Sequence, residues 1–360
     1  MKASFKRWVS ILSLAAMPAV ATVAPGSEDA KTLFDHGLLR RAAAACEQRL
    51  AADAQDAQAS ALLSRIRSVQ GKKDEALKLA TAAVTADAKS ADVQYALAEA
   101  YGREAQQASM IRQAGLAGKM RKASEAALAI DPNHVDALAI SSDFYRMAPG
   151  IIGGDKKKAA EYVERIAKVD AVAGWLRRAN LALSDKDSVR AAECYRQAAA
   201  AQPPDGRAQV AYASWLSQPW RDPQLAEKLA LAAVQAEPWR TGGWQLLAAV
   251  YAHQERWADL ENVLRQSEAA EPSHLAPWYQ AARQLIVDGK DPARAEAYLR
   301  HYLSRDPEIG AQSVAAARWR LGLALEQQGR KADAVTEVEA AVKLDPKLED
   351  AKKDLKRLRG

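Results

Sequence analysis

The most regular pattern of apolar and polar positions lies in the last third of the chain. Trp244, Leu247, Ala248 and Tyr251 lie at positions i, i+3, i+4 and i+7, so they share one face of a helix. A second apolar stretch follows and ends at Pro272. Proline ends a helix because it lacks a backbone donor and disfavours helical geometry in the residue before it. The segment therefore predicts two helices joined by a short turn.

The same pattern recurs along the chain with a period of about 34 residues or slightly more. Position 20 of the unit, where the second helix packs against its neighbours, holds Ala in seven of nine units: Ala42, Ala76, Met120, Ala159, Ala191, Ala226, Leu260, Ala295 and Ala334. Proline ends the second helix in six units, at Pro132, Pro203, Pro238, Pro272, Pro307 and Pro346. We predict nine helix pairs starting near residues 23, 57, 91, 135, 172, 207, 241, 275 and 315, followed by a capping helix over residues 349–360.

Large, large, small and aromatic residues at positions 4, 7, 8 and 11, with proline at position 32, resemble the tetratricopeptide repeat (TPR). The resemblance covers residues 25–348 and implies an all-α fold, a right-handed α-solenoid of about nine helix-turn-helix units. It also implies a non-enzymatic scaffold that binds protein partners in its concave groove. The composition agrees, because Ala-rich stretches and only 3 phenylalanines leave little from which to build a sheet.

Residues 1–24 have the three parts of a secretory signal peptide. Lys6 and Arg7 form a basic start, residues 8–16 are apolar, and small residues around Ala21 suit cleavage near residues 21–24. The apolar run is shorter than the roughly 20 residues that span a membrane. We therefore predict an exported protein, periplasmic or secreted, that is soluble after cleavage. An uncleaved leader retained as an anchor would be its one attachment to a membrane.

The net charge of +6 does not predict nucleic-acid binding, because much of it lies in the leader. Lys2, Lys6 and Arg7 precede the first acidic residue, which leaves 48 basic against 45 acidic residues in the rest of the chain. Basic runs such as residues 156–158 are followed by acids, as on solvated helix faces. The expected partners are proteins, and self-association into a homo-oligomer remains open.

The residues that carry chemistry in enzymes form no recognisable site. The five histidines show neither the i, i+4 spacing nor the nearby cysteines of a metal site. Cys46 and Cys194 lie four units apart, too far for a disulfide, and we expect both to pack as buried thiols. Neither a nucleophile elbow nor a P-loop is present. We therefore expect no enzyme activity, no metal and no cofactor.

The resemblance places positions 2, 5, 9, 12 and 13 of each first helix on the inner groove. Exposed aromatic side chains there are candidate hot spots for binding, above all Trp215 and Trp319. The predicted partner-binding residues are Tyr95, Glu99, Arg103, Arg146, Asn180, Trp215, Gln245, Tyr279, Arg283 and Trp319.

Two places depart from the repeat. About ten extra residues between Tyr101 and Ala123 predict a lengthened hairpin in the third unit. In the fourth unit the turn expands into a loop over residues 147–155, with Pro149, Gly150, Ile151, Ile152, Gly153 and Gly154. We interpret its glycines as a tight turn, while an anion at the start of the following helix remains an alternative.

This loop resembles loops of bacterial envelope repeat proteins, including ones that sit beside periplasmic solute-binding transporters. The first functional hypothesis is a protein-binding scaffold of the cell envelope. The alternative is an accessory periplasmic component of a solute transport system, which would use the lengthened third unit and the Gly-rich loop.

Overall fold

The structure is a computed structural model that describes residues 29–106, 108–218 and 220–360. The predicted signal peptide over residues 1–24 lies outside the described residues. The described part consists of nineteen α-helices and one short 3₁₀ turn, without strands, so the predicted all-α fold is confirmed. No helix in these ranges is both long and apolar enough to cross a bilayer.

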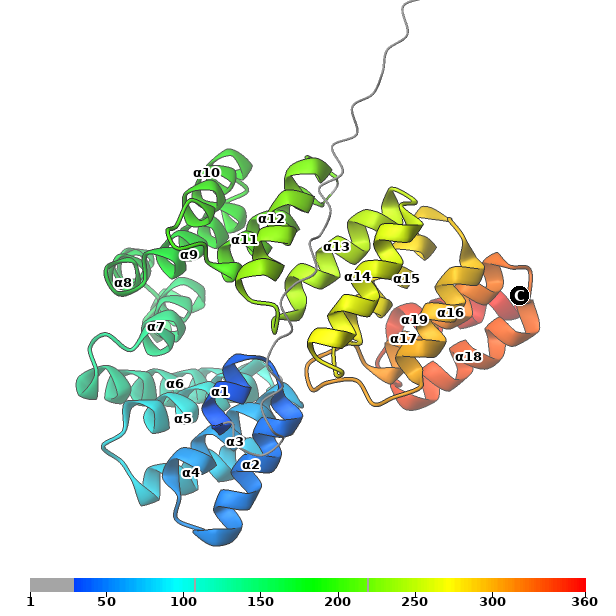
Figure 1. Cartoon of the computed structure of the whole chain (residues 1–360). Helices are drawn as coiled ribbons and strands as arrows, with labels where there is room; N and C mark the ends of the chain where they lie inside the picture. The colour runs from blue at the N-terminus through cyan, green and yellow to red at the C-terminus, as the bar shows by residue number, and fades with distance from the viewer. Residues whose placement is uncertain (1–28, 107, 219) are drawn as a thin grey trace, which may run out of the picture.

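Eighteen helices form nine antiparallel pairs, and a single helix follows them (Figure 1). The pairs are α1 (Ala30–Asp35) with α2 (Leu39–Ala52), α3 (Ala57–Val69) with α4 (Lys73–Ala86), α5 (Ala91–Gln106) with α6 (Met110–Ile130), α7 (Val135–Met147) with α8 (Lys156–Val169), α9 (Ala171–Ser184) with α10 (Ser188–Ala199), α11 (Gly206–Leu216) with α12 (Pro223–Ala236), α13 (Thr241–His253) with α14 (Trp257–Ala270), α15 (Ala276–Asp288) with α16 (Pro292–Leu303), and α17 (Val314–Gln327) with α18 (Lys331–Leu344). The last helix is α19 (Glu349–Arg359).

The alanines at position 20 are all buried, each at 2% exposure or less. A methyl group there lets the second helix of a pair lie close to the first, and larger side chains around it fill the core. Met120 and Leu260 depart from alanine at this position. Leu260 is fully buried, whereas Met120 lies in the lengthened third unit and is only partly buried.

Prolines and acidic residues set several helix ends. Pro132, Pro238, Pro272 and Pro346 each come two residues after the last residue of a second helix. At helix starts, side chains such as Asp56 accept a hydrogen bond from a free backbone amide, in that case from the Ala59 N–H at 2.9 Å. Both signals are local, which explains why the sequence pattern identifies the helices.

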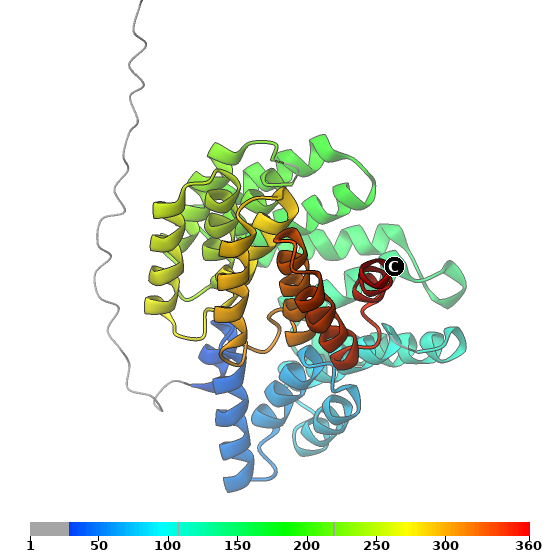
Figure 2. The same ribbon diagram turned by 90° about the vertical axis from the view of Figure 1, so that its right-hand side faces the viewer.

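The array of pairs curves until its beginning meets a later part of the chain. In Figures 1 and 2 the first pair, in blue, lies beside the turns of the yellow and orange segments. The rings of His36 and Trp239 pack with their centroids 4.8 Å apart, and Arg40 bonds to residues 306–308. The first pair therefore contacts turns far later in the sequence, and the array closes on itself.

Cys46 and Cys194 are both free and buried, as expected for thiols that pack as apolar groups. Burial raises the pKa of the Cys46 thiol to about 11, so this thiol is neutral at physiological pH.

Candidate binding site

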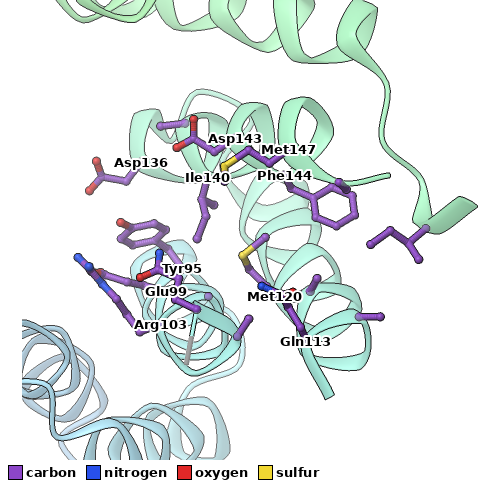
Figure 3. Close-up of a pocket in the computed structure, with 18 of the residues that line it drawn as sticks. Tyr95, Glu99, Arg103, Gln113, Met120, Asp136, Ile140, Asp143, Phe144 and Met147 are labelled. Carbon is purple, nitrogen blue, oxygen red and sulfur yellow. The ribbon is translucent and has the colours of Figure 1, made fainter. Parts of the chain in front are cut away.

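A cavity of about 590 Å³ opens on the inner face between α5, α6 and α7. Figure 3 shows Tyr95, Glu99 and Arg103 of α5 on one side of it and Ile140, Asp143 and Phe144 of α7 on the opposite side. The lengthened third unit and the enlarged turn of the fourth unit meet here.

Apart from Gln113, the α6 side chains that line the cavity are apolar. Ala114 and Ala117 come from the first half of α6, and Met120 follows one turn later. The thioether of Met120 has room because the residue opposite is glycine: a Cβ on Gly102 would lie 3.0 Å from its sulfur. A larger residue at position 20 and a smaller one on α5 therefore direct a flexible apolar side chain into the cavity.

Residues of the Gly-rich loop close one end of the cavity. Met147, Ala148, Pro149 and Ile152 line it, whereas Ile151 is 95% exposed at the tip of the loop. The loop itself is tightly folded.

Two glycines make that loop fold achievable. Gly153 has a φ of +101°, in the left-handed region that favours glycine. A Cβ on Gly154 would lie 1.7 Å from the carbonyl oxygen of Ala148, and the Gly154 N–H donates to the Pro149 carbonyl at 3.1 Å. The predicted tight turn is what the structure has.

Two backbone amides at the start of α8 are already bonded to a side chain. The carboxylate of Asp155 already accepts hydrogen bonds from the N–H groups of Lys157 at 2.9 Å and Lys158 at 3.2 Å. A side-chain cap of this kind satisfies the amides that an anion would use. These two amides are therefore occupied within the chain, while other residues of the loop line the cavity.

The other end of the cavity is charged. Arg65 of α3 bonds to Glu99 at 3.1 Å and to Asp136 at 3.2 Å, and so links the second, third and fourth units. Arg177 of α9 pairs with Asp143 at 3.0 Å. Arg103 approaches Glu99 only to 3.8 Å and is half exposed. The exposed carboxylates of Asp136 and Asp143 and the guanidinium of Arg103 remain accessible to a polar group of a ligand.

Tyr95 lies at the centre of this charged end. The guanidinium of Arg65 stacks over its ring at 4.9 Å, and its ring packs against His134 at 5.3 Å. Burial, helped by the charges of Glu99 and Asp136, raises the pKa of the Tyr95 hydroxyl above its usual range. Tyr95 is thus a neutral hydrogen-bonding group between the apolar wall and the charges.

The cavity combines two kinds of surface. An apolar interior with charges at one end can take a large apolar side chain or a small molecule with one polar end. The described His, Cys, Asp and Glu side chains form no group that could hold a metal ion.

The structure brings together three of the ten predicted groove residues, since Tyr95, Glu99 and Arg103 line the cavity. Arg146 of α7 is partly exposed but does not line it. Asn180 is exposed on α9, while Gln245 on α13 and Arg283 on α15 are partly buried. These four residues lie along the inner helices without forming a common site with the first three.

Tyr279 is not on an accessible surface, which corrects the expectation for this residue. It is 5% exposed and packs against Tyr302, with ring centroids 5.4 Å apart. The reason is that α15 packs directly against α13 and α17, so the first helices of the last three units form one continuous core.

The two candidate tryptophans have different surroundings. Trp215 packs with Tyr195 and Tyr212 and borders a second hollow of about 410 Å³, where the Arg221 guanidinium lies 4.6 Å above its ring. Trp319 is partly buried, and its Nε1 donates to Asp354 at 2.8 Å. This hydrogen bond links Trp319 of α17 to α19.

The apolar cavity residues Met120, Ile140 and Phe144 were not predicted as part of a site, and Met147 was predicted only as the first residue of the loop over residues 147–155. One signal was present, because Met120 interrupts the row of alanines at position 20. The direction of its side chain depends on Gly102, which lies on another helix.

Comparisons with known proteins agree with this fold. The sequence profile of the tetratricopeptide repeat matches residues 315–348, a segment that begins in α17 and includes α18. The structure is similar to that of yeast Tom70, with a TM-score of 0.50, 13% identity, and coverage of 92% of this chain and 86% of that chain. No curated protein matches the sequence. The chain is thus an all-helical, TPR-like repeat array.

Two bacterial TPR proteins are less similar in structure. One from Thermus thermophilus has a TM-score of 0.46 and 22% identity, over 52% of this chain and 95% of that chain. One from Parabacteroides merdae has a TM-score of 0.46 and 14% identity, over 73% of this chain and 99% of that chain.

Proposed function

We propose that this TPR-like array is a protein-binding scaffold, and that the cavity between α5, α6 and α7 receives an apolar side chain of the partner segment. The observation that carries the proposal is a largely apolar wall beside exposed, only partly neutralised charges, since interface hot spots combine a desolvated pocket with polar groups around it. Asp136, Asp143 and Arg103 would then hydrogen-bond the flanking residues of that segment.

The partner can be identified by site-specific crosslinking in cells. A photoreactive residue in place of Ile140 faces the cavity, whereas one in place of Ile151 sits at the exposed tip of the loop. We expect position 140 to capture one defined partner and position 151 to give a weaker or different pattern.

Affinity for the identified partner then tests the cavity directly. Ile140→Glu places a carboxylate against the apolar wall and is expected to weaken binding at least about tenfold, because a buried charge without a partner is costly. Ile151→Glu makes the same chemical change outside the cavity and serves as the matched control. Equal affinity of the two variants, with unchanged helical circular dichroism, would refute the assignment of the cavity.

We further propose that the protein acts in the cell envelope. The support is the three-part pattern of residues 1–24. The test is fractionation of cells that express the full-length chain, with mass spectrometry of its N-terminus. We expect a periplasmic or secreted protein that begins near residues 22–25. A cytoplasmic protein with an intact leader would contradict export.

A second candidate function is binding of a small solute, as an accessory component of a transport system. The observation in its favour is the position and size of the cavity: it lies at the lengthened third unit and the Gly-rich loop, and about 590 Å³ falls in the range of small-molecule pockets. Native mass spectrometry of the purified protein should then detect a bound small molecule. Ala117→Phe fills the cavity and should remove it, while Ala129→Phe on the exposed side of α6 should not.

A further inference from the structure

The connection between α16 and α17, residues 304–313, is unusually long and contacts the first helix pair. The other turns between pairs, such as the one from Glu271 to Leu275, have at most six residues. The connection is folded around Gly310, whose φ is +85° and whose Cα faces Val69 of α3 closely enough that a Cβ would lie 3.1 Å from its methyl group.

Glu308 of this connection caps α2. The N-cap residue of α2 is Leu38, whose apolar side chain cannot accept a hydrogen bond, and the first turn of α2 carries no acidic residue. The Glu308 carboxylate accepts a hydrogen bond from the backbone N–H of Arg40 at 2.9 Å. A carboxylate in this position also stabilises the positive end of the helix dipole. The cap comes from 268 residues away in the sequence.

The side chain of Arg40 also bonds to this connection. Its Nε and Nη2 atoms donate to the carbonyl oxygen of Pro307 at 3.0 and 2.6 Å, and its guanidinium lies 3.6 Å from Asp306. Ile309 adds the apolar part of the contact, since it packs against the core formed by α1, α2 and α3.

Two neighbouring turns extend the contact. Arg41 pairs with Glu271 at 3.3 Å, and His36 packs against Trp239. The closing contact therefore joins the first pair to three successive turns, and most of its groups are polar and at least partly exposed. Contacts between parts of a chain that are small and polar open more readily than apolar cores.

We propose that residues 304–313 form a latch that holds the array closed on itself, and that its release opens the inner face to a partner. The second half of this proposal rests on the proposed function, because it takes the inner face as the binding surface. The first half does not, and it is measured without any partner.

Closure is tested with spin labels on the full chain at Ala44→Cys in α2 and Ala297→Cys in α16, both exposed positions, after replacement of the two native cysteines by alanine. The parent protein should give one narrow distribution of distances. Glu308→Ala combined with Ile309→Ser should give a longer and broader distribution at unchanged helical content. Glu161→Ala, which removes an exposed carboxylate on α8, is the control and should match the parent. A double variant whose distribution superimposes on that of the parent overturns the latch.

Ionic strength provides a second test that needs no substitution at the latch. Raising salt from about 0.1 M to about 1 M shortens the screening length from about 10 to about 3 Å and weakens exposed ion pairs. The parent distances should lengthen. No change at high salt, even where the double variant fails to fold, would show that the exposed ion pairs do not hold the array closed, which overturns the latch as a polar contact.

Access is tested with the partner segment identified by crosslinking. If the closed form cannot bind, the latch variant should associate several-fold faster than the parent, since the fraction of competent molecules rises. An unchanged association rate would overturn the claim that release of the latch opens the inner face to the partner. The claim that the latch holds the array closed is still tested separately, by the distances between the spin labels. A segment that binds neither form counts against the proposed function alone.

Discussion

The third and fourth helix pairs and the last three pairs use the same repeat but treat their inner faces in opposite ways. In α13, α15 and α17 the first helices pack against each other, and Trp244, Tyr279 and Leu321 belong to one continuous core. Between α5 and α7 the facing residues include Gly102 and Ala139, and a cavity remains. The comparison shows that a cavity forms in such an array where large side chains are left out of the inner face.

The largest effect is expected in the filled region. Trp244→Ala should lower the free energy of unfolding by about 3–5 kcal/mol, because the side chain is 1% exposed and its loss leaves a large void. It also removes the hydrogen bond from its Nε1 to the Pro238 carbonyl. Urea denaturation followed by circular dichroism measures this. A cost below about 1 kcal/mol would contradict a tightly packed inner face in this region.

The next largest effect concerns the loop that closes the cavity. Gly154→Ala should cost about 2 kcal/mol and displace the loop, because its Cβ would overlap the Ala148 carbonyl. Gly150→Ala is the matched control, since no atom lies within 4 Å of a Cβ there. Thermal melting of both variants distinguishes them, and equal melting temperatures would show that the loop adapts without cost.

The open region itself should tolerate truncation. Met120→Ala is expected to lower the free energy of unfolding by about 1 kcal/mol or less. The side chain already borders the cavity, so its truncation removes few packing contacts. The measurement is the urea denaturation used for Trp244→Ala. A cost similar to that of Trp244→Ala would mean that the cavity is closed in solution, and would remove the contrast between the two regions.

The smallest effect is a pH dependence at the edge of the open region. The Nε2 atom of His134 bonds to Asp92 at 3.1 Å, an interaction that lowers the pKa of Asp92. The Nδ1 atom of His134 accepts the Ala137 N–H only while the imidazole is neutral, so this cap is not part of the charged pair. Burial acts to lower the pKa of His134, but the hydrogen bond and charge of Asp92 outweigh it and raise this pKa.

The raised pKa of His134 and the lowered pKa of Asp92 determine how stability depends on pH. The contribution of His134 is complete below its ordinary pKa of 6.5 and is lost as pH rises through the raised value. That of Asp92 is complete above 3.8 and is lost as pH falls through the lowered value. Asp92→Asn should therefore destabilise most between these values, by less than about 1 kcal/mol since Asp92 is 61% exposed. Denaturation at pH 5.5 and pH 8.5 tests this, and a larger cost at pH 8.5 would contradict the assignment.

Local signals in the sequence account for most of the fold. Alanine at position 20 and proline after the second helices act within one unit, so they predict helix pairs without knowledge of the rest of the chain. The sequence also indicates a long connection over residues 304–313, because the predicted unit starts at 275 and 315 are further apart than one repeat length. Its contact with α2 depends on the curvature of the whole array, which no local pattern records.

The candidate site was predicted only in part, for a similar reason. Tyr95, Glu99 and Arg103 follow from their positions in the repeat, and they line the cavity. Tyr279 occupies a comparable repeat position but is buried, because the packing of α15 on its neighbours decides its exposure. The position of a residue in the repeat predicts which way its side chain points within its own unit. Whether that side chain is exposed to solvent depends on how the adjacent units pack.

The cap that Glu308 provides for α2 has a consequence for the order of folding during synthesis. The ribosome makes α2 long before residue 308, so the first pair leaves it without this cap and without Ile309 in its core. Units in the middle of the chain can fold on their neighbours as they emerge. The pair that is made first is therefore among the last to be completed, and a chain that stops before residue 308 should carry an N-terminal pair that exchanges its amide hydrogens rapidly.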